Sequence, residues 1–421
     1  MSSLLRLFSY DGYTVSDVQV STRKQSVCVL LERAEQPMRC CRCDLPMTQY
    51  RGRHRISLKE LSVMSFKTEV RFWRQKGWCE GCKKTRSDKV DFMSYETPHY
   101  TQSYAEWLGT MCEFSPVSRV AKFNEVPAST LRRIDHKRMR QMLKTYRIPD
   151  VTHISVDEVY ARTKPKHRGE KRDKRFFTVI SDLNTRRVIW VTESRDKAAL
   201  DEFFHILGRR RCEKLQVVAI DQHDAYRASV KDHCPQATTV WDRFHVMQSF
   251  NEAVNETRKD LHAEAPAKSD MARLTRGKYR YLFLKKSSRR SKIETNHIDQ
   301  VFLENSRFCQ LEIIKERMHS FFDQPSVQLA KDVFCEIGNW IWQMDFKPLM
   351  RWYRHLERNW DTLKNYFEFR VTTSLSEGIN NVIKALKRRA YGYRNMDYFR
   401  LKIMQVCGYL NSDYAGKQAV T

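Results

Sequence analysis

The sequence has no long hydrophobic run, and it contains few residues that interrupt regular structure. No apolar stretch approaches the roughly 20 residues that a membrane-spanning helix needs. The N-terminal segment MSSLLRLFSYDG holds an arginine inside its short apolar stretch and no signal-peptide cleavage pattern. Gly and Pro number 13 and 11, and no internal repeat or low-complexity tract is present. These absences exclude the helical membrane, fibrous and disordered classes, so we expect a folded cytoplasmic protein with no membrane partner.

Acidic residues are scarce relative to basic ones. The 50 Asp and Glu stand against 76 Lys and Arg, which gives a formal net charge of +26. The positive side chains repel one another unless the protein binds a polyanion, and nucleic acid is the usual polyanion. The alternative is a cationic surface that only keeps the chain in solution. With 421 residues, of which 41% are hydrophobic, the chain can form about two to four domains with more than one core.

The 12 cysteines do not predict a disulfide framework, because the expected compartment is reducing. Two pairs, Cys40 with Cys43 and Cys79 with Cys82, have the C-x-x-C spacing that lets both thiolates reach one tetrahedral Zn²⁺. Strands are expected around them, in YTVSDVQV, SVCVLLE and the alternating LSVMSFKTEVRFW. We therefore predict a zinc-ribbon domain over residues 1–95 with a structural Zn²⁺. The alternative is four reduced core cysteines.

Residues 96–148 change to a helical pattern that fits a helix-turn-helix domain. A short helix before Asn124 and a second helix that begins near Pro127 would pack through Leu131, Ile134 and Met142. Any packed helix pair can imitate this motif. If it binds DNA, the side chains that face outward on the second helix could reach base edges and phosphates. They are Ser129, Arg132, Arg133 and His136.

The remainder of the chain predicts an α/β domain with an interruption. Residues 149–250 contain a strand, a hairpin and then strands that alternate with helices, which gives a mixed sheet flanked by helices. Residues 251–365 are helical, charged and rich in tryptophan, and we interpret them as an insertion. Residues 366–421 would complete the α/β domain. The loop RTKPKHRGEKRDKR could hold a phosphate backbone or be a solvated turn.

Three acids stand out from this basic background. Asp157 and Asp221 each follow an apolar strand, and buried carboxylates are costly unless positive charge holds them. Glu377 begins the amphipathic segment SEGINNVIKALKRRAYGYRN. On this helix Ile379, Val382, Ile383 and Leu386 share one face, and Glu377, Asn380, Asn381, Lys384 and Arg388 lie on the opposite one. A helix N-terminus favours an anion in any case.

Taken together, the three acids predict a metal centre. Two strand-end aspartates and a helical glutamate can hold two Mg²⁺ ions about 4 Å apart over a phosphodiester, with Mn²⁺ as a substitute. Other acids compete for this role. The side chain of Glu158 should point to the opposite face of its strand, and Asp182 lies at a hairpin turn. Asp224 follows the second strand and could contact the metal ligands without binding the metal itself.

Four segments carry a resemblance to a known family: SVDEV at 155–159, AIDQHDAY at 219–226, WDRFHV at 241–246 and SEGINNVIKALKRRAYGYRN at 376–395. They resemble bacterial insertion-sequence transposases of the ISL-three group, and the last segment is the most specific. That group also has a cysteine-knuckle zinc ribbon and a helix-turn-helix ahead of its catalytic domain. The resemblance therefore covers almost the whole chain.

The resemblance implies an RNase H-like DDE domain interrupted by a helical insertion, with Asp157, Asp221 and Glu377 as the catalytic triad. Asp242 and His245 match a D-x-x-H signature, in which His245 orients DNA or a strand, unless it only caps a helix. The implied activity is binding of terminal inverted repeats, Mg²⁺-dependent cleavage and strand transfer to target DNA. It implies a homodimer or larger assembly at the nucleoid. The cations that would hold the backbone are Lys384, Lys387, Arg388 and Arg389.

Two other functions fit part of the sequence. A non-catalytic DNA-binding regulator derived from a transposase would use the cysteine pairs, the helix-turn-helix and the charge, but it would not need three acids. A structure-selective nuclease on the same catalytic fold would need the acids, but a recognition helix indicates reading of duplex sequence instead.

Overall fold

The computed structural model describes residues 9–94, 97–163, 174–265, 275, 277–371 and 374–411. The chain divides into two compact units, residues 1–146 with 410–421, and residues 147–409. The first unit therefore contains both the cysteine pairs and the expected helix-turn-helix. The second contains the three acids.

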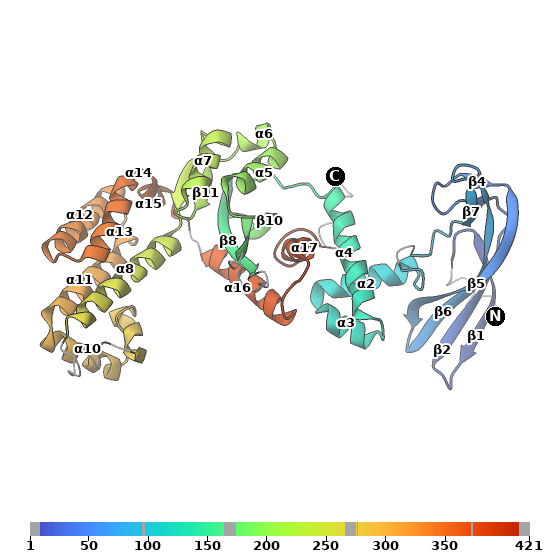
Figure 1. Cartoon of the computed structure of the whole chain (residues 1–421), viewed down its shortest axis with the longest axis horizontal. Helices are drawn as coiled ribbons and strands as arrows, with labels where there is room; N and C mark the ends of the chain where they lie inside the picture. Colours follow the sequence, from blue (N-terminus) through green and yellow to red (C-terminus); the bar gives the residue numbers. More distant parts are fainter. Residues whose placement is uncertain are drawn as a thin grey trace, which may run out of the picture. The chain divides into compact units, whose positions relative to one another are not determined.

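The first unit begins with a five-stranded sheet (Figure 1). The strands are β1 (Tyr13–Ser21), β2 (Ser26–Arg33), β5 (Gln49–Val63), β6 (Phe66–Cys79) and β7 (Lys84–Ser87). Their order is β1-β2-β6-β5, and β7 pairs with β6. β2 and β6 are parallel, whereas the other pairs are antiparallel. Between β2 and β5 in the chain, β3 (Met38–Arg39) and β4 (Pro46–Met47) form a separate two-stranded sheet.

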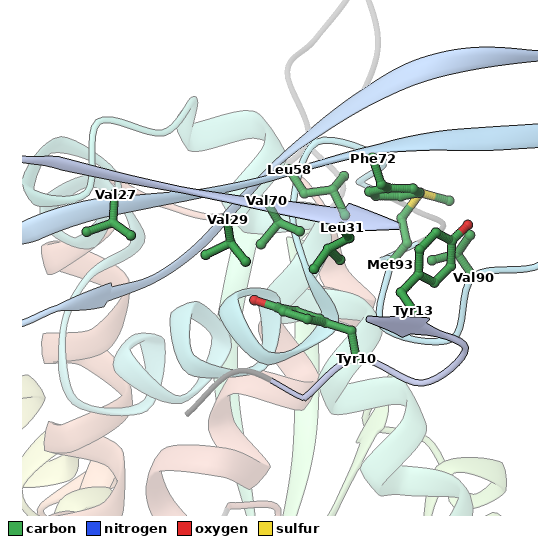
Figure 2. Packing of buried hydrophobic residues seen from close by; sticks show 10 residues of the cluster. All are labelled: Tyr10, Tyr13, Val27, Val29, Leu31, Leu58, Val70, Phe72, Val90 and Met93. Atoms are coloured by element: carbon green, nitrogen blue, oxygen red, sulfur yellow. The ribbon is translucent and has the colours of Figure 1, made fainter. Parts of the chain in front are cut away.

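One side of this sheet is apolar, because buried residues alternate with exposed ones along the strands. Figure 2 shows ten residues of the resulting core, including Leu58 from β5 and Val70 and Phe72 from β6. The interpretation of LSVMSFKTEVRFW as one alternating strand is wrong. Val63 pairs with Phe66 across a tight turn, and Met64 adopts φ 54° at its tip with its side chain exposed. The stretch is the end of β5 and most of β6.

Among the described residues, three helices complete the first unit: α2 (Gln102–Phe114), α3 (Val117–Phe123) and α4 (Ala128–Thr145). The hydroxyl of Thr101 caps α2 by accepting from the backbone N–H of Tyr104. As expected, Leu131 and Ile134 of α4 are buried against α2 and α3. Met142 is only half-buried.

The second unit contains a mixed five-stranded sheet. Its strands are β8 (His153–Thr163), β9 (Lys174–Asp182), β10 (Arg187–Glu193), β11 (Val217–Ile220) and β12 (Thr238–Trp241), in the order β10-β9-β8-β11-β12. β8, β9 and β10 form an antiparallel meander, and β11 lies parallel to both β8 and β12. Parallel strands need crossover connections. They contain α5 (Lys197–Leu207), α6 (Arg209–Cys212) and α7 (Asp224–His233).

The segment expected as an insertion is helical, but its first helix starts before residue 251. α8 (Arg243–Ala263) runs without a break through the boundary that the sequence placed at residue 250 (Figure 1). The helices after it are α10 (Lys292–Glu304), α11 (Ser306–Phe321), α12 (Val327–Gln343), α13 (Lys347–Arg358), α14 (Trp360–Leu363) and α15 (Asn365–Phe369). Aromatic side chains form much of their core, among them Phe308, Phe321 and Phe334.

Two helices return to the sheet after the insertion, α16 (Ser374–Arg389) and α17 (Met396–Cys407). α17 packs on β10, and Phe399 is buried against Phe177 of β9. α16 contacts β8. The carboxylate-bearing strand and the glutamate-bearing helix are therefore neighbours, although more than 200 residues separate them.

Candidate functional site

Asp157 occupies the middle of the central strand. β8 pairs with β9 on one side and, in its first residues, with β11 on the other. The Asp157 side chain is buried, and one oxygen, Oδ1, accepts from the backbone N–H of Glu158 at 2.7 Å. Because its carboxylate is buried, polar or positive neighbours are needed to balance it.

Asp221 and Asp242 follow the two parallel neighbours of β8. Asp221 comes directly after β11, is partly buried, and accepts from the backbone N–H of His223 at 2.9 Å. Burial raises the pKa of Asp221, and the charge of Asp157 adds to the rise, although His245 and His223 oppose it. Asp242 comes directly after β12 and caps α8 by accepting from the backbone N–H of Phe244 at 2.6 Å. By the strand register, all three aspartates lie at the same level of β8, β11 and β12, where β11 and β12 end and β8 continues.

His245 provides the balancing charge. Its Nε2 atom lies 3.3 Å from Asp157 Oδ1 and 3.9 Å from Asp242 Oδ2. Burial alone would lower the pKa of His245, but the hydrogen bond and charge of Asp157, with the charges of Asp242 and Asp221, raise it to about 9. In the absence of a metal ion, these neighbours favour the charged imidazolium form of the ring. His245 does not cap α8, since Asp242 does.

Asn380 is a residue of this centre that the sequence reasoning missed. Its Nδ2 atom donates to Asp157 Oδ2 at 2.6 Å, and its Oδ1 atom is buried with no hydrogen-bond partner among the described residues. The sequence placed Asn380 on the face opposite the apolar one, yet it turns toward β8 beside the buried Ile379 and Ile383. Val382, which was expected to be buried, is 43% exposed. A hydrogen bond to a buried carboxylate sets the rotation of the helix more strongly than one valine.

Glu377 lies one helical turn before Asn380, and its side chain is exposed. In the part of the chain that the structure describes, the four paired cysteines are the one group of three or more Cys, His, Asp or Glu side chains close enough to share a metal ion. Asp157, Asp221, Asp242 and His245 are therefore neighbours, joined by the contacts of His245 with Asp157 and Asp242, but their ligand atoms are not close enough to share one metal ion as they stand. Glu377 lies outside this cluster. The role of Glu377 as a ligand stays a prediction.

The competing acids have other roles. The Asp182 carboxylate accepts from the backbone of Asn184 and from the hydroxyl of Thr185 and so stabilises the β9–β10 turn, as its position indicated. Asp224 is exposed in the first turn of α7 and pairs with Arg227. Glu158 accepts from the hydroxyl of Tyr226 at 3.5 Å and lies 3.6 Å from the guanidinium of Arg195. Burial and the charge of Asp221 raise the pKa of Glu158.

The cysteine pairs form a compact cluster. The Sγ atoms of Cys40, Cys43, Cys79 and Cys82 all lie within 4.8 Å of one another. Recorded Sγ–Sγ distances are 3.3 Å for Cys43 with Cys79, 3.6 Å for Cys43 with Cys82 and 3.8 Å for Cys40 with Cys82. Zn–S bonds of about 2.3 Å in a tetrahedron require sulfur atoms about 3.8 Å apart. The donor set and its spacing are compatible with a structural Zn²⁺, and Cys41 is not part of the cluster.

The same local geometry builds both halves of this cluster. Each pair lies at a hairpin turn, between β3 and β4 or between β6 and β7. The residue after each second cysteine, Asp44 or Lys83, adopts a left-handed φ, 61° or 51°. Burial would raise the pKa of Cys40, but the backbone N–H groups of Cys43 and Arg42 and the neighbouring thiols lower it to about 7. Such hydrogen bonds favour the thiolate that a metal binds.

The candidate DNA-binding side chains lie on two helices. On α4, Ser129, Arg132 and Arg133 are exposed and His136 is half-buried. On α16, Lys384, Arg388 and Arg389 are exposed. Lys387 is half-buried, and its ammonium donates to the backbone oxygen of Tyr160 at 3.5 Å and lies 4.4 Å from the centre of that ring. Most of the basic loop at 162–175, residues 164–173, lies outside the described residues.

The family emerges from comparison with known proteins. The model of a family described as "Transposase", that of the DDE transposases of the ISL-three group, matches residues 154–403, more than half of the chain. The matched range includes β8, β11 and α16. The chain belongs to this transposase family.

Curated relatives align with this transposase along most of their length. A transposase for insertion sequence element IS1001 of Bordetella parapertussis is 25% identical over 412 residues, which cover 94% of this chain and 96% of that protein. Transposases for IS1557 from two Mycobacterium tuberculosis strains are each 22% identical over 393 residues, 85% of this chain and 83% of theirs. Within the described residues, none of the helices is long and apolar enough to span a membrane.

Proposed function

We propose that this transposase binds the terminal inverted repeats of an insertion sequence and catalyses strand cleavage and strand transfer at a centre built by Asp157, Asp221 and Glu377. The observation that carries the proposal is the convergence of Asp157 and Asp221 beside the helix that bears Glu377, inside the matched family region. The strand order β10-β9-β8-β11-β12, with an antiparallel meander followed by parallel strands, supports an RNase H-like catalytic domain.

The residues of this centre fit divalent metal ions. Carboxylate and amide oxygens are the ligands that Mg²⁺ prefers, and Mn²⁺ accepts the same set. Asp157 and Asp221 supply carboxylates, and the unpartnered Oδ1 of Asn380 is a further oxygen in the same place. When bound, two such ions would activate water or a 3′-hydroxyl and stabilise the leaving oxygen of the phosphodiester.

The chain's own groups position the reacting strand around these oxygens. His245 fixes one oxygen of Asp157 and Asn380 fixes the other, so the carboxylate cannot rotate freely. Glu377 is three residues from Asn380, which corresponds to about 4.5 Å along a helix axis. Binding of DNA and metal would bring Glu377 to the centre while Asn380 keeps its contact with Asp157. Lys384, Arg388 and Arg389 on the same helix would then hold the backbone.

The remaining groups serve recognition. Ser129, Arg132, Arg133 and His136 of α4 would read the ends in a major groove, and the cysteine cluster with Zn²⁺ would stabilise the preceding sheet. Because two ends must be held together, the active form is a homodimer or larger assembly on the nucleoid DNA. Single substitutions test the proposal. We expect Asp157→Asn and Glu377→Gln to abolish Mg²⁺-dependent cleavage of end DNA while end binding survives.

The control and the contrary results are equally specific. Asp224→Asn removes an exposed carboxylate from the neighbouring helix and should cleave at the wild-type rate. Cleavage retained by Asp157→Asn or by Glu377→Gln would remove the assignment of that residue. If the wild-type protein binds end DNA but does not cleave it with any divalent ion, the protein is a non-catalytic regulator.

A further inference from the structure

The outward face of the first sheet carries an unusual combination of side chains. Arg53 and Arg55 lie two residues apart on β5, so they share a face, and Arg55 is directly paired with Trp73 of β6. Arg71, also on β6, pairs with Ser57 and extends the same face. The opposite face contributes Leu58, Val70 and Phe72 to the core (Figure 2). We call Arg53, Arg55, Arg71 and Trp73 the arginine–tryptophan face.

Trp73 is exposed although nothing in the fold requires it. Its side chain is 48% exposed, and the guanidinium of Arg53 lies 4.8 Å from the ring centre. A guanidinium stacked on an indole is held flat and loses less conformational freedom when it later binds a phosphate. The contact therefore orients Arg53 without neutralising its charge.

The arginines of β5 also lack acidic partners. Both side chains are exposed, and among the described residues neither Arg53 nor Arg55 forms an ion pair. Arg71 does pair, with Glu69 at 2.8 Å. Positive charge is present on the other side of the strands as well, since burial together with the charges of Lys76 and Arg74 lowers the pKa of His54. This part of the sheet is therefore a concentrated cationic region.

Protection of an edge strand explains only half of this pattern. β5 is the outer strand of the sheet, and charged side chains on such strands discourage pairing with other chains. An exposed tryptophan works against that purpose, because it adds apolar surface and β-propensity. The tryptophan instead holds the guanidinium of Arg53 in place, and arginine guanidinium groups suit the geometry of phosphate.

We propose that the arginine–tryptophan face binds the sugar–phosphate backbone of duplex DNA, independently of α4. The proposal rests on the proposed function only for the choice of duplex DNA as the polyanion. The face adds affinity without reading sequence, because guanidinium–phosphate contacts carry no base information. The sheet that the cysteine cluster stabilises is thereby a second DNA-binding surface of the first unit.

Salt-dependent binding of the full-length protein tests this. The probe is a random-sequence duplex of about 30 base pairs, roughly three helical turns, studied by fluorescence anisotropy with EDTA present so that no cleavage occurs. For Arg53→Ala/Arg55→Ala we expect roughly tenfold weaker binding, with the slope of log K against log salt smaller by about 1.8, since each phosphate contact contributes about 0.9. Arg53→Lys/Arg55→Lys keeps both charges and should keep most of the slope.

The matched control is Arg23→Ala/Lys24→Ala, which removes the same charge from the exposed β1–β2 turn of the same sheet. It should leave the slope unchanged. An equal loss in this control would show a general charge effect and overturn the proposal. An unchanged slope in Arg53→Ala/Arg55→Ala, with the zinc content of the wild type, would also overturn the proposal. A single-stranded RNA of the same length is the second probe, and a loss of affinity for this RNA without a loss for the duplex would overturn it as well. None of these outcomes bears on cleavage, so the catalytic proposal is tested separately.

Discussion

The two candidate metal sites of this transposase differ in how far the chain assembles them unaided. In the cysteine cluster, four sulfur atoms already lie within 4.8 Å of one another. In the acidic centre, Asp157 and Asp221 are neighbours, but His245 and Asn380 contact Asp157, and Glu377 remains exposed on the next helical turn.

The difference follows from charge and from chain connectivity. The cysteines come from two short hairpin turns that the same sheet holds, and thiols can remain neutral while they are close together. Carboxylates repel one another, so a cluster of three without a cation is costly. The chain sets one histidine, His245, among three aspartates and leaves a fourth carboxylate, Glu377, outside. A structural site can be finished at folding, whereas the acidic centre would be completed only when DNA and metal arrive.

The largest effect is expected from Asp221→Asn. Loss of this carboxylate should lower the cleavage rate by roughly a thousandfold or more, the range found when a group that stabilises developing charge is removed. Zinc content and thermal stability should not fall, because the substitution removes a partly buried charge of raised pKa. Single-turnover cleavage with metal analysis checks this. A loss of zinc in parallel would contradict the independence of the two sites.

Removal of zinc should act on the other unit. Cys79→Ser should reduce bound zinc to none and cost the first unit about 4 kcal/mol of stability, as expected for loss of a structural metal. Elemental analysis and hydrogen exchange in β3, β4 and β7 measure both. Cys41→Ser is the matched control, because Cys41 is adjacent in sequence but outside the cluster. If Cys41→Ser lost zinc and Cys79→Ser retained it, the ligand set would be wrong.

Asn380→Ala should produce a smaller, specific loss. Removing a residue that orients a metal ligand typically reduces activity about 10- to 100-fold. The dependence of the rate on Mg²⁺ concentration should shift to higher concentrations, which a purely structural role would not cause. Asn381→Ala, at the exposed neighbouring position, should behave as wild type. Equal rates for the two variants would mean that the contact between Asn380 and Asp157 has no catalytic consequence.

Arg132→Ala should change recognition and leave chemistry intact. An arginine that contacts a base edge contributes about 1–3 kcal/mol of discrimination, so we expect the preference for end DNA over random DNA to fall by one to two orders of magnitude at most. The cleavage rate of fully bound complexes should remain unchanged. Lys144→Ala, exposed in the last turn of the same helix, is the control. Retained preference in Arg132→Ala would remove this side chain from the recognition surface.

The spacing of the cysteine pairs and the position of Asp221 directly after β11 follow from local pattern, whereas Asp157, which was expected at a strand end, lies in the middle of β8. C-x-x-C spacing specifies a turn, and an acid after an apolar strand specifies an edge of a sheet. The β5–β6 turn was missed although the adjacent apolar residues Val63 and Met64 break the alternation at that point. Asn380 was placed on the wrong side because periodicity alone fixed the helix face, whereas Asp157, more than 200 residues away, draws the amide inward. The boundary placed at residue 250 falls inside α8, which begins directly after β12 and continues to Ala263, and no change in the sequence pattern marks the start of that helix as a domain limit.

The most direct test of the acidic centre counts metal ions. Mn²⁺ bound to the protein on end DNA can be measured by electron paramagnetic resonance, for the wild type and for Glu377→Gln. The proposal predicts about two ions per active site in the wild type, and loss of at least one in Glu377→Gln without loss of DNA binding. Equal occupancy in both proteins would contradict the claim that Glu377 joins Asp157 and Asp221.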